Sequence, residues 1–276
     1  MTNVLKAIVT FTKEKNLVLP NPPGARNRMN SMGDAAETYM KDLFCDAFNL
    51  AEVDKIEKHN AELSYIGNSS NPPDFILRGG DAVEVKKIEG RRPDIALNSS
   101  FPKHRLLVSD IRITQDCRNC EDWREKDIIY SIVSVSGRNI DNICMVYGDC
   151  YCADNSIYER IINHMTEGIH KIEYIELAES TNELARLNRV DPLGITYLRV
   201  RGMWGIKHPY NVFSYIENLD ENVLNVFLLK SKYDSFPEDD RKKLESIKSI
   251  HVRDIKIKNP NNPADLLDAK HIFIIK

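Results

Sequence analysis

Residues 71–87, with the sequence NPPDFILRGGDAVEVKK, decide the fold that we predict for this chain. Two short apolar segments, Phe75–Leu77 and Ala82–Val85, lie on either side of a Gly-Gly pair. Short apolar runs separated by glycines are typical of a β-hairpin. We therefore predict two antiparallel strands joined by a turn that contains Gly79 and Gly80.

This hairpin carries three charged residues that matter for function: Asp74, Glu84 and Lys86. Because side chains alternate along a strand, Glu84 and Lys86 share one face, and Val83 and Val85 point to the other, which we expect to be core. Asp74 reaches the charged face only if the loop has three residues or the hairpin has a bulge, since a two-residue loop places it opposite Val85. Two adjacent glycines permit that register.

An acid pair beside a lysine is a set of groups suited to phosphodiester hydrolysis. Magnesium prefers hard oxygen ligands and takes one or two protein carboxylates together with water and substrate phosphate. Asp74 and Glu84 are therefore the candidate Mg²⁺ ligands. Lys86 is the candidate that orients or helps to deprotonate an attacking water and offsets charge at the phosphate. The alternative is a surface hairpin with ordinary solvated charges.

The spacing Pro73-Asp74, nine residues, Glu84-Val85-Lys86 resembles the signature of the PD-(D/E)xK nucleases. Three other acid-x-Lys triplets occur, and none follows Pro-Asp at hairpin distance. The resemblance implies an α/β fold, a restriction-endonuclease-like core with a mixed central β-sheet flanked by helices. It also implies a catalytic role for Glu37 in the preceding helix, GDAAETYMKDLF, for which a solvated helix face is the alternative.

Length and composition fit either one large α/β domain or a core domain with an appended lobe. With 276 residues, 42% hydrophobic and 29% charged, the chain is long enough for a sizeable core. We expect a single domain over 1–276, with a catalytic core at about 30–155 and DNA-recognition and dimerisation elements at about 156–276. No apolar run has membrane-spanning length and the N-terminus lacks a signal-peptide pattern, so we expect no membrane association and a cytoplasmic location.

Hydrophobic periodicity predicts the other elements. Dense β-branched residues in IIYSIVSV indicate a central strand, and isoleucines at helical spacing after Ser156 indicate a helix. The predicted helices are 2–15, 32–48 with Ser31 as N-cap, 156–172, 175–187 and 237–246. The predicted strands are 61–66, 106–108, 111–113, 128–135, 143–152, 195–200, 223–229, 250–257 and, at a sheet edge, 272–275.

The net charge is −3, so DNA contacts are sought in local basic segments. From residue 86 to 105 there are six Lys or Arg and two acids, and residues 199–210 combine basic and aromatic side chains with glycines. Either segment is also compatible with a solvated loop or the polar face of an edge strand. The candidate phosphate contacts are Arg26, Arg28, Arg91, Arg92, Lys103 and Arg105, and the candidate base contacts are Arg199, Arg201, Lys207 and His208.

Four of the six cysteines form the pairs Cys117-x-x-Cys120 and Cys150-x-Cys152. This spacing is compatible with a structural zinc site. Cysteines in apolar stretches also serve as small hydrophobic residues, and the sequence leaves both interpretations open.

Beyond the signature, the whole chain resembles the NgoPII-type restriction endonucleases, in the PNPPGARNRMN loop, the GDAAETYMKD helix and the hairpin. The resemblance implies a type II enzyme that cuts double-stranded DNA at the palindrome GGCC with Mg²⁺, acts as a homodimer and has a companion DNA methyltransferase. Two alternatives remain open. One is another PD-(D/E)xK nuclease that acts in repair or on DNA structure, and the other is a non-catalytic DNA-binding scaffold.

Overall fold

A computed structural model of the chain describes residues 1–20, 28–68, 71–179, 181 and 183–276. Its centre is an eight-stranded sheet in which two neighbouring pairs are parallel, β3 with β7 and β8 with β13, and the other five pairs are antiparallel. In spatial order the strands are β1 (Leu63–Asn68), β2 (Asn71–Leu77), β3 (Ala82–Glu89), β7 (Ile128–Ser136), β8 (Asn139–Tyr147), β13 (Asn222–Leu229), β15 (Leu266–Ile275) and β14 (His251–Lys258).

The middle strands are buried on both faces. β7 buries its first six residues, all of them apolar or aromatic except Ser131, and β8 buries its last five. Strands covered on both faces carry continuous apolar runs, whereas half-exposed strands alternate. The predicted mixed central sheet flanked by helices is therefore confirmed.

Three helices precede or lead into the sheet: α1 (Val4–Lys13), α2 (Arg28–Cys45) and α3 (Glu52–Glu62). The Asn3 side chain caps α1 by accepting a hydrogen bond from the backbone N–H of Lys6. α1 packs against α2, and α2 packs in turn against β3, the strand that carries Glu84 and Lys86. The remaining described elements are α4 (Gln115–Asn119), α5 (Gly148–Tyr151), α7 (Pro209–Val212), α8 (Lys230–Ser235), α9 (Glu238–Glu245), the 3-10 helix Leu219–Glu221, β4 (Ile95–Asn98), β5 (Leu106–Leu107) and β6 (Glu125–Lys126).

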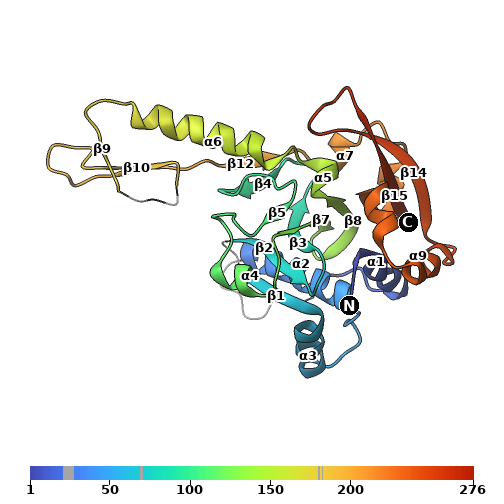
Figure 1. Cartoon of the computed structure of the whole chain (residues 1–276). Helices are drawn as coiled ribbons and strands as arrows, with labels where there is room; N and C mark the ends of the chain where they lie inside the picture. The colour runs from blue at the N-terminus through green and yellow to red at the C-terminus, as the bar shows by residue number, and fades with distance from the viewer. Residues whose placement is uncertain (21–27, 69–70, 180, 182) are drawn as a thin grey trace.

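An extended arm leaves the main body after α5 and returns before α7 (Figure 1). We define the arm as residues 155–179 and 183–206. It contains α6 (Asn155–His170), the small three-stranded sheet of β9 (Glu176–Leu177), β10 (Ala185–Asn188) and β11 (Leu198–Val200), and finally β12 (Trp204–Ile206), which pairs with β4 of the body.

Several sequence predictions were wrong. The segment 175–187 forms strands β9 and β10 in place of a helix, 111–113 is a turn, and α3 was not predicted. α2 begins at Arg28, so Ser31 lies inside the helix. β15 lies between β13 and β14 rather than at an edge, because both of its neighbours pair with it over long ladders. Strands β13, β14 and β15, which follow residue 155 in the chain, complete the central sheet.

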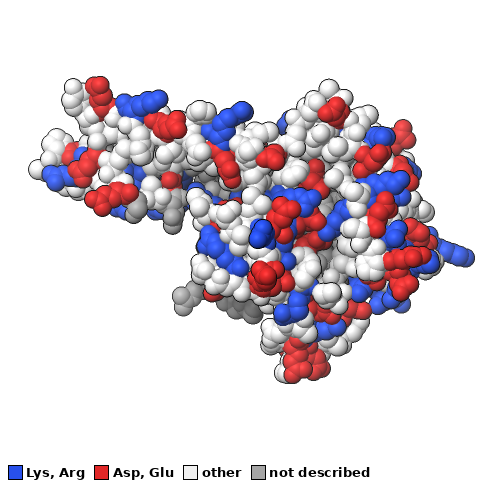
Figure 2. Space-filling view, in the orientation of Figure 1, with Lys and Arg blue, Asp and Glu red and all other residues white. Residues whose placement is uncertain are grey.

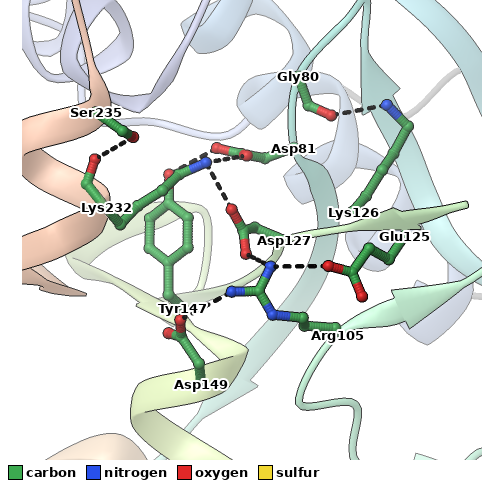
Figure 3. Close-up of polar contacts among 10 residues, drawn as sticks. All are labelled: Gly80, Asp81, Arg105, Glu125, Lys126, Asp127, Tyr147, Asp149, Lys232 and Ser235. Atoms are coloured by element: carbon green, nitrogen blue, oxygen red, sulfur yellow. Dashed lines mark hydrogen bonds and ion pairs between the residues drawn. The ribbon is translucent and has the colours of Figure 1, made fainter. Parts of the chain in front are cut away.

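An ion-pair network joins α8 to the residues that precede β3 and β7 (Figure 3). Lys232 in α8 contacts Asp81 and Asp127, which stand before β3 and β7, with Nζ–O distances of 2.7 Å to each. The Tyr147 hydroxyl donates to the other Asp81 oxygen at 2.6 Å, and Arg105 lies 2.7 Å from Asp127 Oδ1. The network therefore holds the start of the strand that carries Glu84.

In the described part of the chain, no helix is long and apolar enough to cross a membrane.

Candidate active site

The hairpin has the register that brings Asp74 to the charged face. β2 and β3 pair Phe75 with Val83 and Ile76 with Ala82, and the Leu77 N–H donates to the Asp81 carbonyl at 2.9 Å. The loop between them therefore has three residues, which confirms the odd register. Gly79 lies in this loop at φ +65°, a left-handed conformation that favours glycine.

Continuing that register places Asp74 opposite Glu84 on the neighbouring strand. The Val85 backbone N–H donates to Asp74 Oδ2 at 2.6 Å, and Lys86 Nζ donates to Glu84 Oε1 at 2.6 Å. Each carboxylate therefore has one oxygen fixed by the hairpin itself. The three side chains meet on one face of β2 and β3.

The charges of these groups interact strongly. Burial raises the pKa of Asp74 well above its usual range, and the nearby Glu84 carboxylate raises it further. Burial alone would lower the pKa of Lys86, but Glu84 and Asp74 outweigh it and raise that pKa. Lys86 is therefore a protonated ammonium at neutral pH in this arrangement. It is suited to orienting a water and offsetting negative charge rather than to accepting a proton.

Glu37 of α2 belongs to the same electrostatic cluster. Burial raises the pKa of Glu37, Lys41 lowers it, and smaller effects come from Lys86 and Glu84. In turn, the Glu37 carboxylate raises the pKa of both Asp74 and Lys86. The helix thus brings a third carboxylate close to the hairpin.

One oxygen atom of the Glu84 carboxylate is placed to accept a divalent cation. Glu84 Oε2 is buried and accepts no hydrogen bond from any residue that the structure describes. A buried carboxylate oxygen without a partner is costly, and a cation beside it removes that cost. Among the described residues, no group of three or more His, Cys, Asp or Glu side chains surrounds a common metal position. Asp74 and Glu84 therefore fit Mg²⁺, which needs few protein ligands, better than an ion that requires a full protein cage.

Behind Glu84 lies a small cavity of about 10 Å³, close to the minimum for one water molecule. Ser100, Lys103 and Tyr130 line it together with Glu84. Like Glu84 Oε2, Ser100 Oγ is buried and without a hydrogen-bond partner among the described residues. Sequence analysis did not find this group, because its members come from three separate segments that only folding brings together.

Two predicted DNA contacts are interior residues, so those assignments are corrected. Lys103 is 1% exposed and its Nζ lies 2.5 Å from Asp110 Oδ2. His208 is 2% exposed, and its Nδ1 accepts a hydrogen bond from the Tyr210 N–H at 3.1 Å. Burial lowers the pKa of His208 to about 4, so the ring is neutral at pH 7. Neither side chain is accessible to a phosphate or a base.

The other predicted DNA contacts have different surroundings. Arg105 is paired within the network of Figure 3, and Arg92 pairs with Asp220 and lies over the Tyr210 ring. Arg199 and Arg201 both form ion pairs with the Glu183 carboxylate on the arm, so an acidic group partly neutralises their positive charge. Arg91 and Lys207 are exposed. Arg26 lies outside the described residues, and Arg28 begins α2 with only its backbone described.

The zinc interpretation of the cysteines is wrong. Cys117, Cys150 and Cys152 are buried in the core and Cys120 packs against it, all as free thiols. They form no metal-binding group among the residues that the structure covers. Burial raises the pKa of Cys117 to about 12, so its thiol is protonated at neutral pH. These residues act as small hydrophobic side chains.

Comparison with known proteins matches nearly the whole chain. The family model described as NgoPII restriction endonuclease matches residues 2–258. The type II restriction enzyme NgoPII of Neisseria gonorrhoeae is 46% identical over 274 residues, which cover 98% of each chain. No solved structure matches. An Asp-Glu-Lys hairpin site and a match over nearly the whole chain lead to one conclusion: the protein belongs to the NgoPII restriction endonuclease family.

Proposed function

We propose that this protein cuts both strands of DNA at the palindrome GGCC in a reaction that requires Mg²⁺. The observation that carries the proposal is the face shared by Asp74, Glu84 and Lys86, with one buried Glu84 oxygen left free. Membership of a family of type II restriction enzymes supports the DNA substrate. The GGCC site, Mg²⁺ and the cytoplasmic location are parts of this proposal.

In this mechanism the hairpin positions its own groups before DNA binds. The Val85 N–H orients Asp74, and Lys86 orients Glu84, so the two carboxylates face one place with little freedom. Asp74 and Glu84 would hold Mg²⁺, which when bound would act as a Lewis acid and lower the pKa of water. The Lys86 ammonium holds the attacking water and stabilises the charge that develops on the scissile phosphate. Glu37 adds negative charge that favours cation binding.

Exposed basic residues are the proposed DNA contacts. Arg91 and Lys207 have accessible side chains, and Arg26 and Arg28 belong to the segment before and at the start of α2. We propose that two copies act together, because a palindrome with a cut in each strand suits a two-fold symmetric enzyme. A companion methyltransferase would protect the same site in the host DNA.

A matched pair of lysine variants tests the catalytic assignment. Lys86 and Lys87 are neighbours, and each is paired with an acid two residues away, Glu84 at 2.6 Å and Glu89 at 2.8 Å. Lys86→Ala should slow plasmid cleavage by about 10² to 10⁴-fold while DNA binding persists, and Lys87→Ala should retain nearly full activity. Glu84→Ala should also lose Mg²⁺-dependent cleavage.

The cleavage pattern separates the candidate functions. Discrete fragments with ends inside GGCC support the proposal, whereas a smear indicates a nonspecific or structure-selective nuclease. Plasmid that stays intact with every divalent metal ion tested indicates a DNA-binding protein without nuclease activity. Equal rates for Lys86→Ala and the wild type contradict the role assigned to Lys86.

A further inference from the structure

We propose that the arm, residues 155–179 and 183–206, is the surface through which two copies of this chain associate. It does not contact DNA bases. The inference rests on the proposed function only in that a palindrome-cutting enzyme needs a pair of active sites. The observations that carry it concern the exposed apolar side chains of the arm and the pairing of its charges.

Large apolar side chains are unusually exposed on the arm. Twenty large apolar residues are exposed among those that the structure describes, and ten of them lie on the arm, which is less than a fifth of the chain. Single exposed apolar residues are normal on protein surfaces, but a concentration of this kind marks an interaction site. The ten are Ile161, Met165, Ile172, Tyr174, Val190, Leu193, Ile195, Tyr197, Leu198 and Met203.

The apolar side of helix α6 is only partly covered within one chain, where Tyr158 at its start packs against Phe101 and Trp204. The helix has 16 residues, yet Asn155 is its one buried residue. Ile161 and Met165 lie one turn apart and are 41% and 52% exposed. Most of the stability of a helix in a protein comes from packing of its apolar face, so an amphipathic helix on a protruding arm requires a partner surface.

The small sheet of the arm presents a second apolar surface. Its register places Leu187 beside both Leu177 and Leu198, so three leucines form a row across the three strands. Leu198 is 50% exposed. The opposite face carries Arg186, which pairs with Arg199 in the register. One face of the sheet is thus apolar and the other polar.

The charges of the arm argue against a DNA partner. Its sequence contains seven Asp or Glu and six Lys or Arg, a net charge of −1. Four of its arginines interact with groups of the arm itself, and Figure 2 shows a mostly white arm with scattered red and blue side chains. Arg199 and Arg201 pair with Glu183, Arg189 lies 3.7 Å from Glu176, and Arg186 lies 4.5 Å from the Tyr197 ring centroid.

A second copy of the chain is the partner that this surface fits. A DNA-binding surface needs an excess of positive charge. A surface on which positive and negative side chains are paired does not repel a second copy of itself across a two-fold axis. At roughly 100 Å² for each half-exposed large side chain, ten side chains present on the order of 1,000 Å². A stable interface buries about 800 Å² on each partner, so the arm is large enough.

The test compares two double variants of the full chain by light scattering coupled to size-exclusion chromatography. Wild type should elute as a dimer of 31.7 kDa chains. Ile161→Glu/Met165→Glu should be monomeric at micromolar concentration, with an unchanged far-UV CD spectrum. The control Val53→Glu/Ile56→Glu changes two apolar residues of α3 that are still more exposed, 69% and 59%, and should remain dimeric. Arg199→Ala/Arg201→Ala should keep its affinity for a GGCC duplex.

Each outcome bears on the inference separately from the nuclease assignment. A monomeric wild type with or without duplex DNA, or a dimeric Ile161→Glu/Met165→Glu variant, overturns the arm as the association surface. A tenfold or greater loss of DNA affinity in Arg199→Ala/Arg201→Ala, with the dimer intact, assigns the arm to DNA instead. None of these measurements requires cleavage, so failure of the proposed function leaves them informative.

Discussion

Replacement of Lys232 by methionine tests whether its ion pairs with Asp81 and Asp127, drawn in Figure 3, stabilise the fold. Methionine keeps most of the apolar stem and removes the ammonium group. Lys232 contacts Asp81 and Asp127 at 2.7 Å each, and the three side chains are 19%, 7% and 15% exposed. The variant therefore leaves two nearly buried carboxylates without this counter-ion.

The burial of the pair sets the expected magnitude. Removing one partner of a buried ion pair costs about 3–5 kcal/mol, and the partial exposure of Lys232 places the expected loss at about 3 kcal/mol. A chain of 276 residues unfolds with an entropy of about 0.6 kcal/mol/K, so Tm should fall by about 5 °C. The control is Lys242→Met, which breaks a pair with Glu238 at 2.6 Å whose side chains are 69% and 67% exposed. It should cost less than about 0.5 kcal/mol.

Differential scanning calorimetry at pH 7 measures both variants. Adding Asp81→Asn to Lys232→Met should restore part of the lost stability, because it removes one uncompensated charge while keeping an oxygen for the Tyr147 hydroxyl. Equal shifts in Tm for Lys232→Met and Lys242→Met would refute the reasoning, because two pairs of similar length would then contribute equally despite different burial.

Two further predictions follow from buried titratable groups. Burial lowers the pKa of His208 to about 4 and of His271 to about 3, against about 6.5 in the unfolded chain. Because the unfolded chain binds these protons first, the free energy of unfolding is highest above pH 6.5. It falls by up to about 1.4 kcal/mol per pH unit for each histidine as pH decreases toward 4. Urea unfolding between pH 7 and 5 should show this slope. The variant His208→Asn, whose side chain can still cap α7, should reduce the slope by the contribution of one histidine. An unchanged slope in this variant contradicts the burial of a neutral His208. Lys103→Met should lower the free energy of unfolding by about 3 kcal/mol, because it leaves the buried Asp110 without its ion-pair partner. A loss of DNA affinity without a loss of stability would instead identify Lys103 as a DNA contact.

The candidate site was predictable because its information is local. Strand alternation and the glycine turn placed Glu84 and Lys86 together, and the three-residue loop brought Asp74 to the same face. Helices α1, α6 and α9 and strands β7, β13 and β14 were predicted near their observed positions for the same reason. Periodicity depends on neighbours in the chain, and no distant contact competes with it there.

The basic residues show where local information ends. Lys103 and Arg105 are two positions apart in one basic segment, yet Lys103 is buried against Asp110. Arg105 joins a network of acids from β6, from α5 and from the position just before β7. Their partners are supplied by other segments, so composition alone assigned both to DNA. The same holds for His208, whose burial depends on the body around α7.

By itself, the sequence determined the hairpin, the identity of its charged side chains and the face on which they lie, since turn chemistry and strand alternation act over a few residues. Tertiary structure alone decided the position of β15 between β13 and β14, the counter-ions of the basic residues and the projection of an apolar arm. These features depend on which distant surfaces exclude water from one another. That selection is made by the packing of the whole chain.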